Sequence, residues 1–156
     1  MKRKIVILCI ALSAAFTTVS TEAKGGIGVA LGNPAGVTLR FDKLVITAGY
    51  TWYDMGAMGA VDYWFLNQKI AGGGENLSWY LGGGAFIGYS AGFLGYYGLG
   101  GAGLLLGARV PVGLQWFPKF ANNIELYVEA APGIRITPIF GFSWQATIGI
   151  RFLIFK

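Results

Sequence analysis

The chain has 156 residues, of which 54% are hydrophobic and only 12% are charged, with 26 glycines and 15% aromatics. Soluble globular domains carry about twice that fraction of charge, so the composition argues against an ordinary soluble domain and favours glycine-rich β-structure. The sequence contains no histidine, which excludes His-based catalysis and Cys/His metal sites. We therefore expect no enzyme, no metal and no cofactor.

The first 23 residues have the layout of a secretory signal peptide. "MKRK" is basic, "IVILCIALSAAF" is apolar, and "TTVSTEA" ends in small residues. We expect cleavage after Ala23, because an apolar core of about twelve residues is short for a membrane span of roughly 20. The alternative is an uncleaved membrane anchor. Cys9 comes too early and follows bulky residues, which disfavours a lipoprotein signal.

Residues 24–156 are expected to form one domain, and cleavage would leave it without a cysteine or a disulfide. Nine Lys/Arg and six Asp/Glu follow residue 23, a net charge of +3 without basic runs. Nucleic acid is therefore not an expected partner.

Residues 76–108 carry no charge and resemble a transmembrane helix by hydropathy alone. However, eleven glycines lie between positions 82 and 107. Each would cost about 1 kcal/mol relative to alanine inside a helix, so strands are the better interpretation.

Side chains alternate with period two along eight segments, and turn sequences such as "NPAG" and "AGGGEN" separate them. Most segments are close to ten residues, the length that a tilted strand needs to cross a bilayer. We predict an all-β fold, an eight-stranded antiparallel up-and-down transmembrane β-barrel. The predicted strands are 25–33, 36–42, 44–53, 59–67, 77–90, 102–117, 123–136 and 141–154.

The alternative to a barrel is a soluble sandwich, whose polar face would be rich in Lys, Glu and Ser. Here the second face carries Gly, Thr, Tyr and a few charges, and the lysines occur only near turns and ends, at positions 24, 43, 69, 119 and 156. This pattern indicates a confined polar interior inside an apolar wall.

The stretch "NIELYVEAAPGIRI", residues 123–136, shows how the charges are placed. Glu125, Glu129 and Arg135 share one parity, opposite to the apolar residues. The two glutamates lie roughly 13 Å apart along a strand, too far for a glycosidase pair, so we interpret them as salt-bridge partners of interior arginines. The predicted lumen charge network comprises Arg40, Asp62, Arg109, Glu125, Glu129, Arg135 and Arg151.

Tryptophans mark the expected membrane interfaces. Trp52 and Trp144 fall at one rim and Trp79 and Trp116 at the other, all with outward parity, whereas Trp64 falls on the interior face. Pro111 lies inside a predicted strand, where it removes a ladder hydrogen bond. We expect a bulge there that keeps Val110 and Val112 outward.

The sequence resembles small outer-membrane β-barrels of the OmpA/OmpX/OmpW type, and more closely a little-characterised barrel family best known from spirochaetes. The stretches that carry the resemblance are "GIGVALGNPAGVTLRF", "VDYWF", "LGARVPVGLQWFP" and "ELYVEAAPGIRI". The resemblance implies a barrel in the bacterial outer membrane and says little about activity. The chain ends in Lys156, whereas such barrels commonly end on an aromatic residue.

Three functions are compatible with these features. The first is a monomeric structural or permeability-related barrel in outer-membrane lipid, with an interior filled by paired charges. The second is a narrow pore or small-ligand carrier, for which interior glycines (49, 82, 84, 88, 107, 113, 133 and 149) would leave space. The third is a surface adhesin that binds a host protein through loops near 33–36, 54–59, 91–102 and 137–141.

Overall fold

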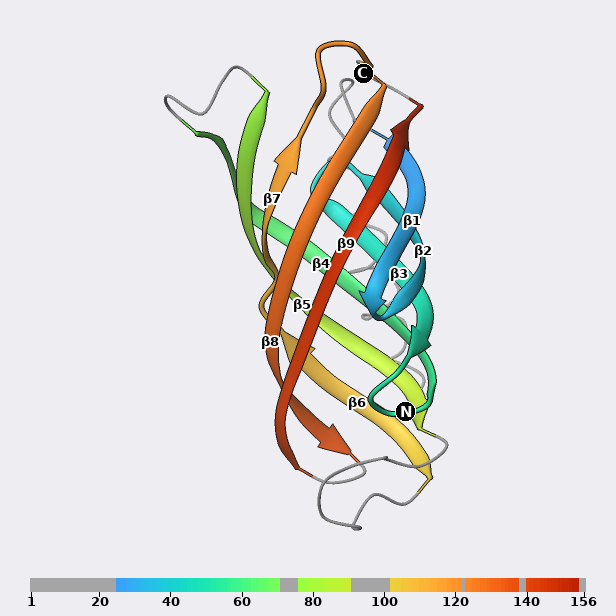
Figure 1. Cartoon of the computed structure of the whole chain (residues 1–156). Helices are drawn as coiled ribbons and strands as arrows, with labels where there is room; N and C mark the ends of the chain where they lie inside the picture. The colour runs from blue at the N-terminus through green and yellow to red at the C-terminus, as the bar shows by residue number, and fades with distance from the viewer. Residues whose placement is uncertain (1–24, 71–75, 91–101, 122, 138–139, 155–156) are drawn as a thin grey trace, which may run out of the picture.

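The computed structural model describes residues 25–70, 76–90, 102–121, 123–137 and 140–154, which form a closed antiparallel β-barrel (Figure 1). Residues 1–24 and Lys156, and with them the expected signal peptide, lie outside this part of the chain. The strand segments are β1 Gly25–Asn33, β2 Ala35–Phe41, β3 Leu44–Thr51, β4 Gly56–Lys69, β5 Leu77–Ser90, β6 Gly103–Arg109, β7 Val112–Trp116, β8 Ile124–Thr137 and β9 Gly141–Leu153.

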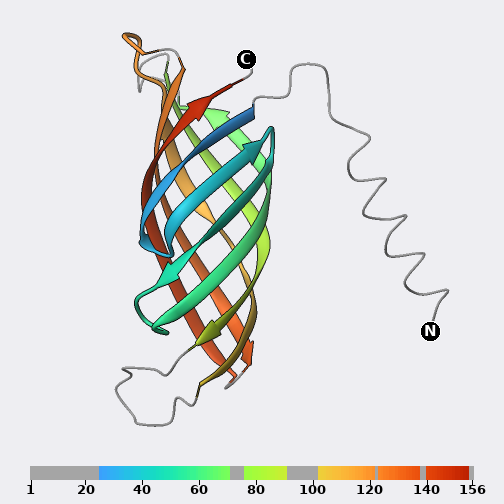
Figure 2. The same cartoon turned by 90° about the vertical axis from the view of Figure 1, so that its right-hand side faces the viewer.

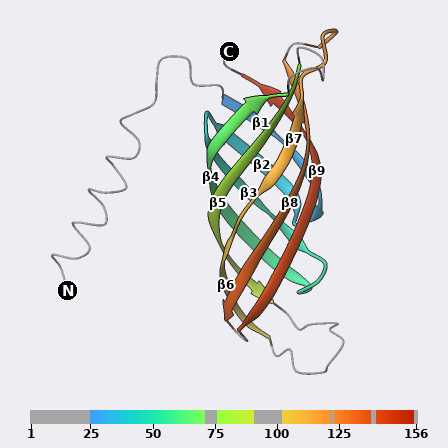
Figure 3. The same cartoon turned by 90° about the vertical axis from the view of Figure 1, so that its left-hand side faces the viewer.

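The nine segments make an eight-stranded barrel, because β6 and β7 both lie between β5 and β8 and are the two halves of one strand. All other pairings join strands that follow one another in the chain, except the pairing of β1 with β9 that closes the cylinder. The two side views show this continuous wall (Figures 2 and 3). The predicted eight-stranded antiparallel barrel is confirmed.

The two ends of the barrel are distinct. We call proximal the rim at which β1 begins and β9 ends, which also carries the 42–43 turn. The distal rim carries Asn33, the 52–55 turn and Gly141. The described lysines, Lys43, Lys69 and Lys119, all belong to the proximal end.

The bulge predicted at Pro111 is wrong. Arg109 pairs with Gly84 and Gly133, and Val112 pairs with Leu81 and Ala130, so the register is the same on both sides of the proline. The strand continues because the Gly82 N–H still donates to the Pro111 carbonyl at 2.8 Å. A Cβ at Gly82 would lie 3.2 Å from Pro111 Cγ, so glycine leaves room for the ring. Val110 and Val112 face outward as expected.

Strand limits differ from the prediction around the second distal turn. β3 ends at Thr51, so Trp52 lies in the turn, and β4 extends from Gly56 to Lys69 rather than over 59–67. The first residues of β4 are mostly small, so their sequence shows no clear apolar–polar alternation. In the structure they nevertheless alternate between inward and outward, with Met58 and Ala60 buried. A register shift between Trp64 and Leu66 allows β4 and β5 to continue to the proximal end.

The wall separates two kinds of surface. Its outer face is a band of apolar side chains that are about half exposed, such as Val29 at 51%, Ile87 at 57% and Ile148 at 60%. Its inner face is closed by buried polar and aromatic side chains.

No helix in the described residues is both long and apolar enough to span a membrane.

Large inward side chains lie directly opposite inward glycines of the neighbouring strand. At Gly84, Gly107, Gly113 and Gly149, an atom of the opposite side chain lies within 2.5 Å of the position that a glycine Cβ would take. Tyr80, for example, would lie 2.4 Å from a Cβ at Gly113. The pairs are Asp62↔Gly84, Trp64↔Gly82, Met58↔Gly88, Phe86↔Gly107, Tyr80↔Gly113, Arg109↔Gly133 and Tyr127↔Gly149. The glycines therefore allow bulky residues to fold flat across the lumen, and they do not leave it empty.

Candidate functional site

The candidate site is the interior of the barrel, where buried charges gather in two clusters. Six charged side chains on five strand segments are at most 6% exposed: Arg40, Asp62, Arg109, Glu125, Glu129 and Arg151. The alternation of each strand places them inward, because neighbouring residues point to opposite faces.

The proximal cluster is built around Glu125 on β8. Its Oε2 accepts a hydrogen bond from Arg40 Nη1 at 2.8 Å, and its Oε1 accepts one from Arg151 Nη1 at 2.8 Å. Arg151 Nε donates to Thr38 Oγ1 at 3.1 Å, and Arg40 Nε donates to the Asp42 carbonyl at 2.9 Å. One carboxylate therefore holds two guanidinium groups from opposite sides of β1.

The central cluster is built around Arg109, at the end of β6. Its guanidinium makes a bidentate contact with Asp62, in which Nε donates to Oδ1 at 2.8 Å and Nη2 donates to Oδ2. Nη2 also donates to Glu129 Oε1 at 3.1 Å, and Nη1 donates to Gln145 Oε1 at 2.5 Å. The Tyr80 hydroxyl donates to Glu129 Oε2 at 2.7 Å. This single arginine thus connects β4, β6, β8 and β9.

Aromatic rings fill the space between the clusters. Trp64 stacks on Tyr80 with 4.0 Å between ring centroids. The Arg40 guanidinium lies 4.6 Å from the Trp64 centroid, and that of Arg151 lies 3.7 Å from the Tyr127 centroid. Desolvated contacts of this kind stabilise a cation by about 2 kcal/mol. Together the rings and ion pairs form a connected set of buried side chains inside the barrel.

The two clusters are electrically neutral only when taken together, because the proximal one has two arginines and one carboxylate and the central one has one arginine and two carboxylates. Three arginines face three carboxylates, and every one of the six has an oppositely charged partner within 3.1 Å. A buried charge is tolerated only when it is paired and hydrogen-bonded, so this pairing allows the six charges to lie buried in the lumen.

The three buried carboxylates are all engaged by arginines, and Glu125 and Glu129 belong to different clusters. In the described ranges, no group of three or more His, Cys, Asp or Glu side chains is placed to hold a metal ion.

Arg135 lies apart from the other residues of the predicted network. It is 25% exposed near the distal rim, and its Nη1 donates to Asp54 Oδ1 at 3.1 Å. Asp54 belongs to the 52–55 turn, outside any alternating segment, so no periodic signal pointed to it.

Sequence reasoning also missed the neutral partners of the charges. Tyr80, Tyr127 and Gln145 have inward parity, but parity alone does not say which of them reach a charged group. Their contacts become visible only once the register is known.

The four rim tryptophans face outward. Trp52 (66% exposed) and Trp144 (57%) lie at the distal rim, and Trp116 (45%) and the half-buried Trp79 lie toward the proximal end. Trp64 is fully buried in the lumen.

Comparison of the chain with protein-family models, with curated proteins and with solved structures found no match. Any assignment of function to this chain therefore rests on the barrel architecture and on the side chains inside it.

Proposed function

We propose that this protein is a monomeric outer-membrane β-barrel that is secreted through a signal peptide at residues 1–23 and has a structural or permeability-related role. In this proposal it is not an enzyme and has no cofactor, and outer-membrane lipid is its principal partner. The barrel is similar in design to the small OmpA/OmpX/OmpW type, although only its architecture supports that likeness.

The outer surface supports a lipid environment. The residues of the wall that point outward are almost entirely apolar, and the charged residues of the strand centres all point inward. A closed barrel satisfies its backbone hydrogen bonds internally, as a protein segment in a bilayer must. Aromatic side chains at both rims match the position of the two interfaces.

The side chains that fill the lumen are the observation that best supports the proposed structural or permeability-related role. Arg109 is held by Asp62, Glu129 and Gln145, while Trp64 and Tyr80 stack beside Arg40 across the interior. An eight-stranded barrel is just wide enough for side chains to fill it. We therefore expect a barrier rather than a channel.

Conductance in planar bilayers tests this function. Wild-type protein and Arg109→Ala should both show no ion-conducting steps, because the aromatic stack remains. The double variant Trp64→Ala, Tyr80→Ala removes that stack and should conduct, while Trp144→Ala at the rim should not. Stepwise conductance of the wild type would instead favour the narrow-pore alternative.

The membrane assignment has its own test. Protein refolded in detergent should migrate differently on a gel before and after heating and should show a β-rich circular dichroism spectrum. A detergent-free, soluble, heat-insensitive monomer would contradict it.

The adhesin alternative depends on loops such as 91–102 and 137–141, of which residues 91–101 and 138–139 lie outside the described part of the chain. Binding of host proteins to whole cells that display the barrel is the observation that would favour it.

A further inference from the structure

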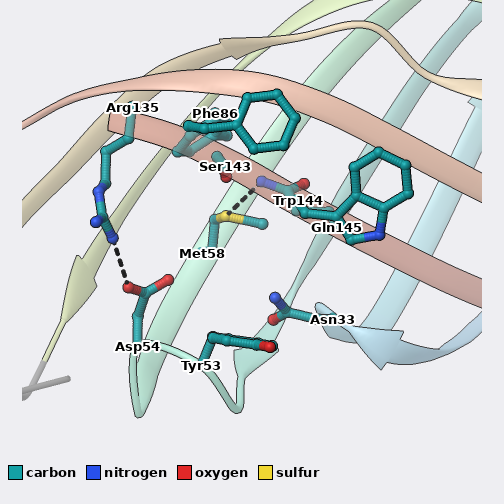
Figure 4. Close-up of a pocket in the computed structure, with 10 residues that line it drawn as sticks. Asn33, Tyr53, Asp54, Met58, Phe86, Arg135, Ser143, Trp144 and Gln145 are labelled. Atoms are coloured by element: carbon teal, nitrogen blue, oxygen red, sulfur yellow. Dashed lines mark hydrogen bonds and ion pairs between the residues drawn. The ribbon is translucent and has the colours of Figure 1, made fainter. Parts of the chain in front are cut away.

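A pocket of about 190 Å³ opens at the distal rim, and Figure 4 shows the side chains that line it. Side chains from β1, β4, β5, β8 and β9 and from the 52–55 turn surround it. Water occupies roughly 30 Å³ per molecule in the liquid, so this volume corresponds to about six waters, or to one small organic ring.

Gln145 lies at the inner side of the pocket, where the pocket meets the central cluster. This side chain is 3% exposed, and its Oε1 is fixed by the hydrogen bond from Arg109. Its Nε2 lies 3.7 Å from the sulfur of Met58, which is a weak acceptor. A buried amide donor is thus oriented without a strong acceptor in the described part of the barrel.

Two further neutral polar groups line the pocket. Asn33 ends β1, and its Oδ1 is buried without a hydrogen-bond partner among the described residues. The terminal torsion of an asparagine is broad, so a rotation can bring this oxygen toward the pocket. Ser143 lies two residues before Gln145 on β9 and therefore shares its inward face.

The remaining lining residues define the charge and the shape of a ligand. Arg135 and Asp54 neutralise each other across 3.1 Å, so they favour neither an anion nor a cation. Phe86 and Met58 provide apolar wall. An apolar wall with a few convergent polar groups is typical of small-molecule sites.

From this geometry we propose that the distal pocket binds one small, neutral, polyhydroxylated molecule of the size of a single sugar ring. A hydroxyl group both donates and accepts, so it satisfies the Gln145 donor and the Asn33 acceptor alike. The C–H face of the ring packs on the apolar wall. The Gln145–Arg109 hydrogen bond closes the inner end, so the ligand binds there and does not pass through.

The chemistry is best tested with three sugars that share one ring and differ in charge. Glucose, glucuronate and glucosamine are titrated against the full barrel in detergent micelles, and binding is followed by saturation-transfer NMR. We expect saturable glucose binding with a dissociation constant on the order of 1 mM, and weaker binding of both charged analogues.

Variants then locate the site. Ser143→Ala should weaken glucose binding by about three- to tenfold, the value of one neutral hydrogen bond. Ser143→Leu should fill the pocket and abolish binding. Ser78→Ala, a buried inward serine near the proximal end, is the matched control and should bind as the wild type does. Heat-modifiable gel mobility verifies that each variant is folded.

Several outcomes overturn the proposal. These are an absence of saturable glucose binding to the wild type, binding of glucuronate or glucosamine that is as tight as that of glucose, and unchanged glucose binding by folded Ser143→Ala. None of these readouts depends on conductance, so the pocket and the filled lumen are tested separately.

Discussion

Replacement of Glu125 by glutamine is the sharpest test of the proximal cluster. Glu125 is fully buried, and its two oxygens hold Arg40 and Arg151 at 2.8 Å each, with both arginines at most 3% exposed. The amide preserves the shape of the side chain and removes its charge, so two buried guanidinium groups lose their common counter-ion. Breaking a buried ion pair by removal of one partner costs about 3–5 kcal/mol.

Urea unfolding, followed by tryptophan fluorescence of the detergent-refolded barrel, measures this loss. For an m-value of about 2 kcal/mol/M, a loss of about 4 kcal/mol lowers the midpoint by about 2 M. Asp54→Asn is the matched control, because it removes the carboxylate from the partly exposed pair with Arg135. Such pairs contribute up to about 1 kcal/mol, so the midpoint should change little. Equal shifts for the two variants would show that the burial of Glu125 does not set its contribution.

Two further predictions concern the glycines and the tryptophans. Gly149→Ala places a methyl group 2.5 Å from the Tyr127 ring and should destabilise the barrel by about 1–3 kcal/mol in the same urea assay. Gly59→Ala, whose Cβ would have its nearest neighbour at 3.9 Å, should stay within about 0.5 kcal/mol, and equal losses would contradict the tight pairing of bulky residues with glycines. In vesicles that contain brominated lipid, a variant that keeps only Trp144 should be quenched, because this side chain is 57% exposed on the outer face. A variant that keeps only the fully buried Trp64 should not be quenched, and the reverse pattern would contradict the assigned faces.

Period-two alternation is sufficient to identify every strand, although not every strand end. Every predicted segment overlaps an observed strand, and the six charged residues of the strand centres are all buried inside the barrel. The signal is strong because each strand separates an apolar surface from a polar one, and a shift by one residue would reverse both.

The partners of those charges could not be predicted from the sequence. Arg109 on β6 reaches Gln145 on β9, although β8 lies between the two strands. Arg40 on β2 likewise reaches Glu125 on β8. Such contacts depend on the stagger of non-adjacent strands around the barrel, which alternation does not encode.

The errors have local physical causes. Pro111 needs no bulge because its cross-strand neighbour is Gly82, whose missing side chain leaves room for the ring. The start of β4 was placed too late because its small residues resemble a turn. Secondary-structure propensity considers each residue without its cross-strand neighbour. The structure shows which residue that neighbour is.

The seam between β1 and β9 affects how the barrel assembles. Its eight residue pairs, from Gly26↔Leu153 to Asn33↔Ala146, join the two ends of the described chain, while every other pairing joins strands that are neighbours in sequence. Contacts between distant segments form late, because they require closure of a long loop. Until they form, β1 and β9 present unpaired backbone N–H and C=O groups on which another chain can pair. Closure of the barrel and pairing with another chain therefore compete for the same two strand edges. The rate at which β1 pairs with β9 determines whether the barrel closes or associates with another molecule.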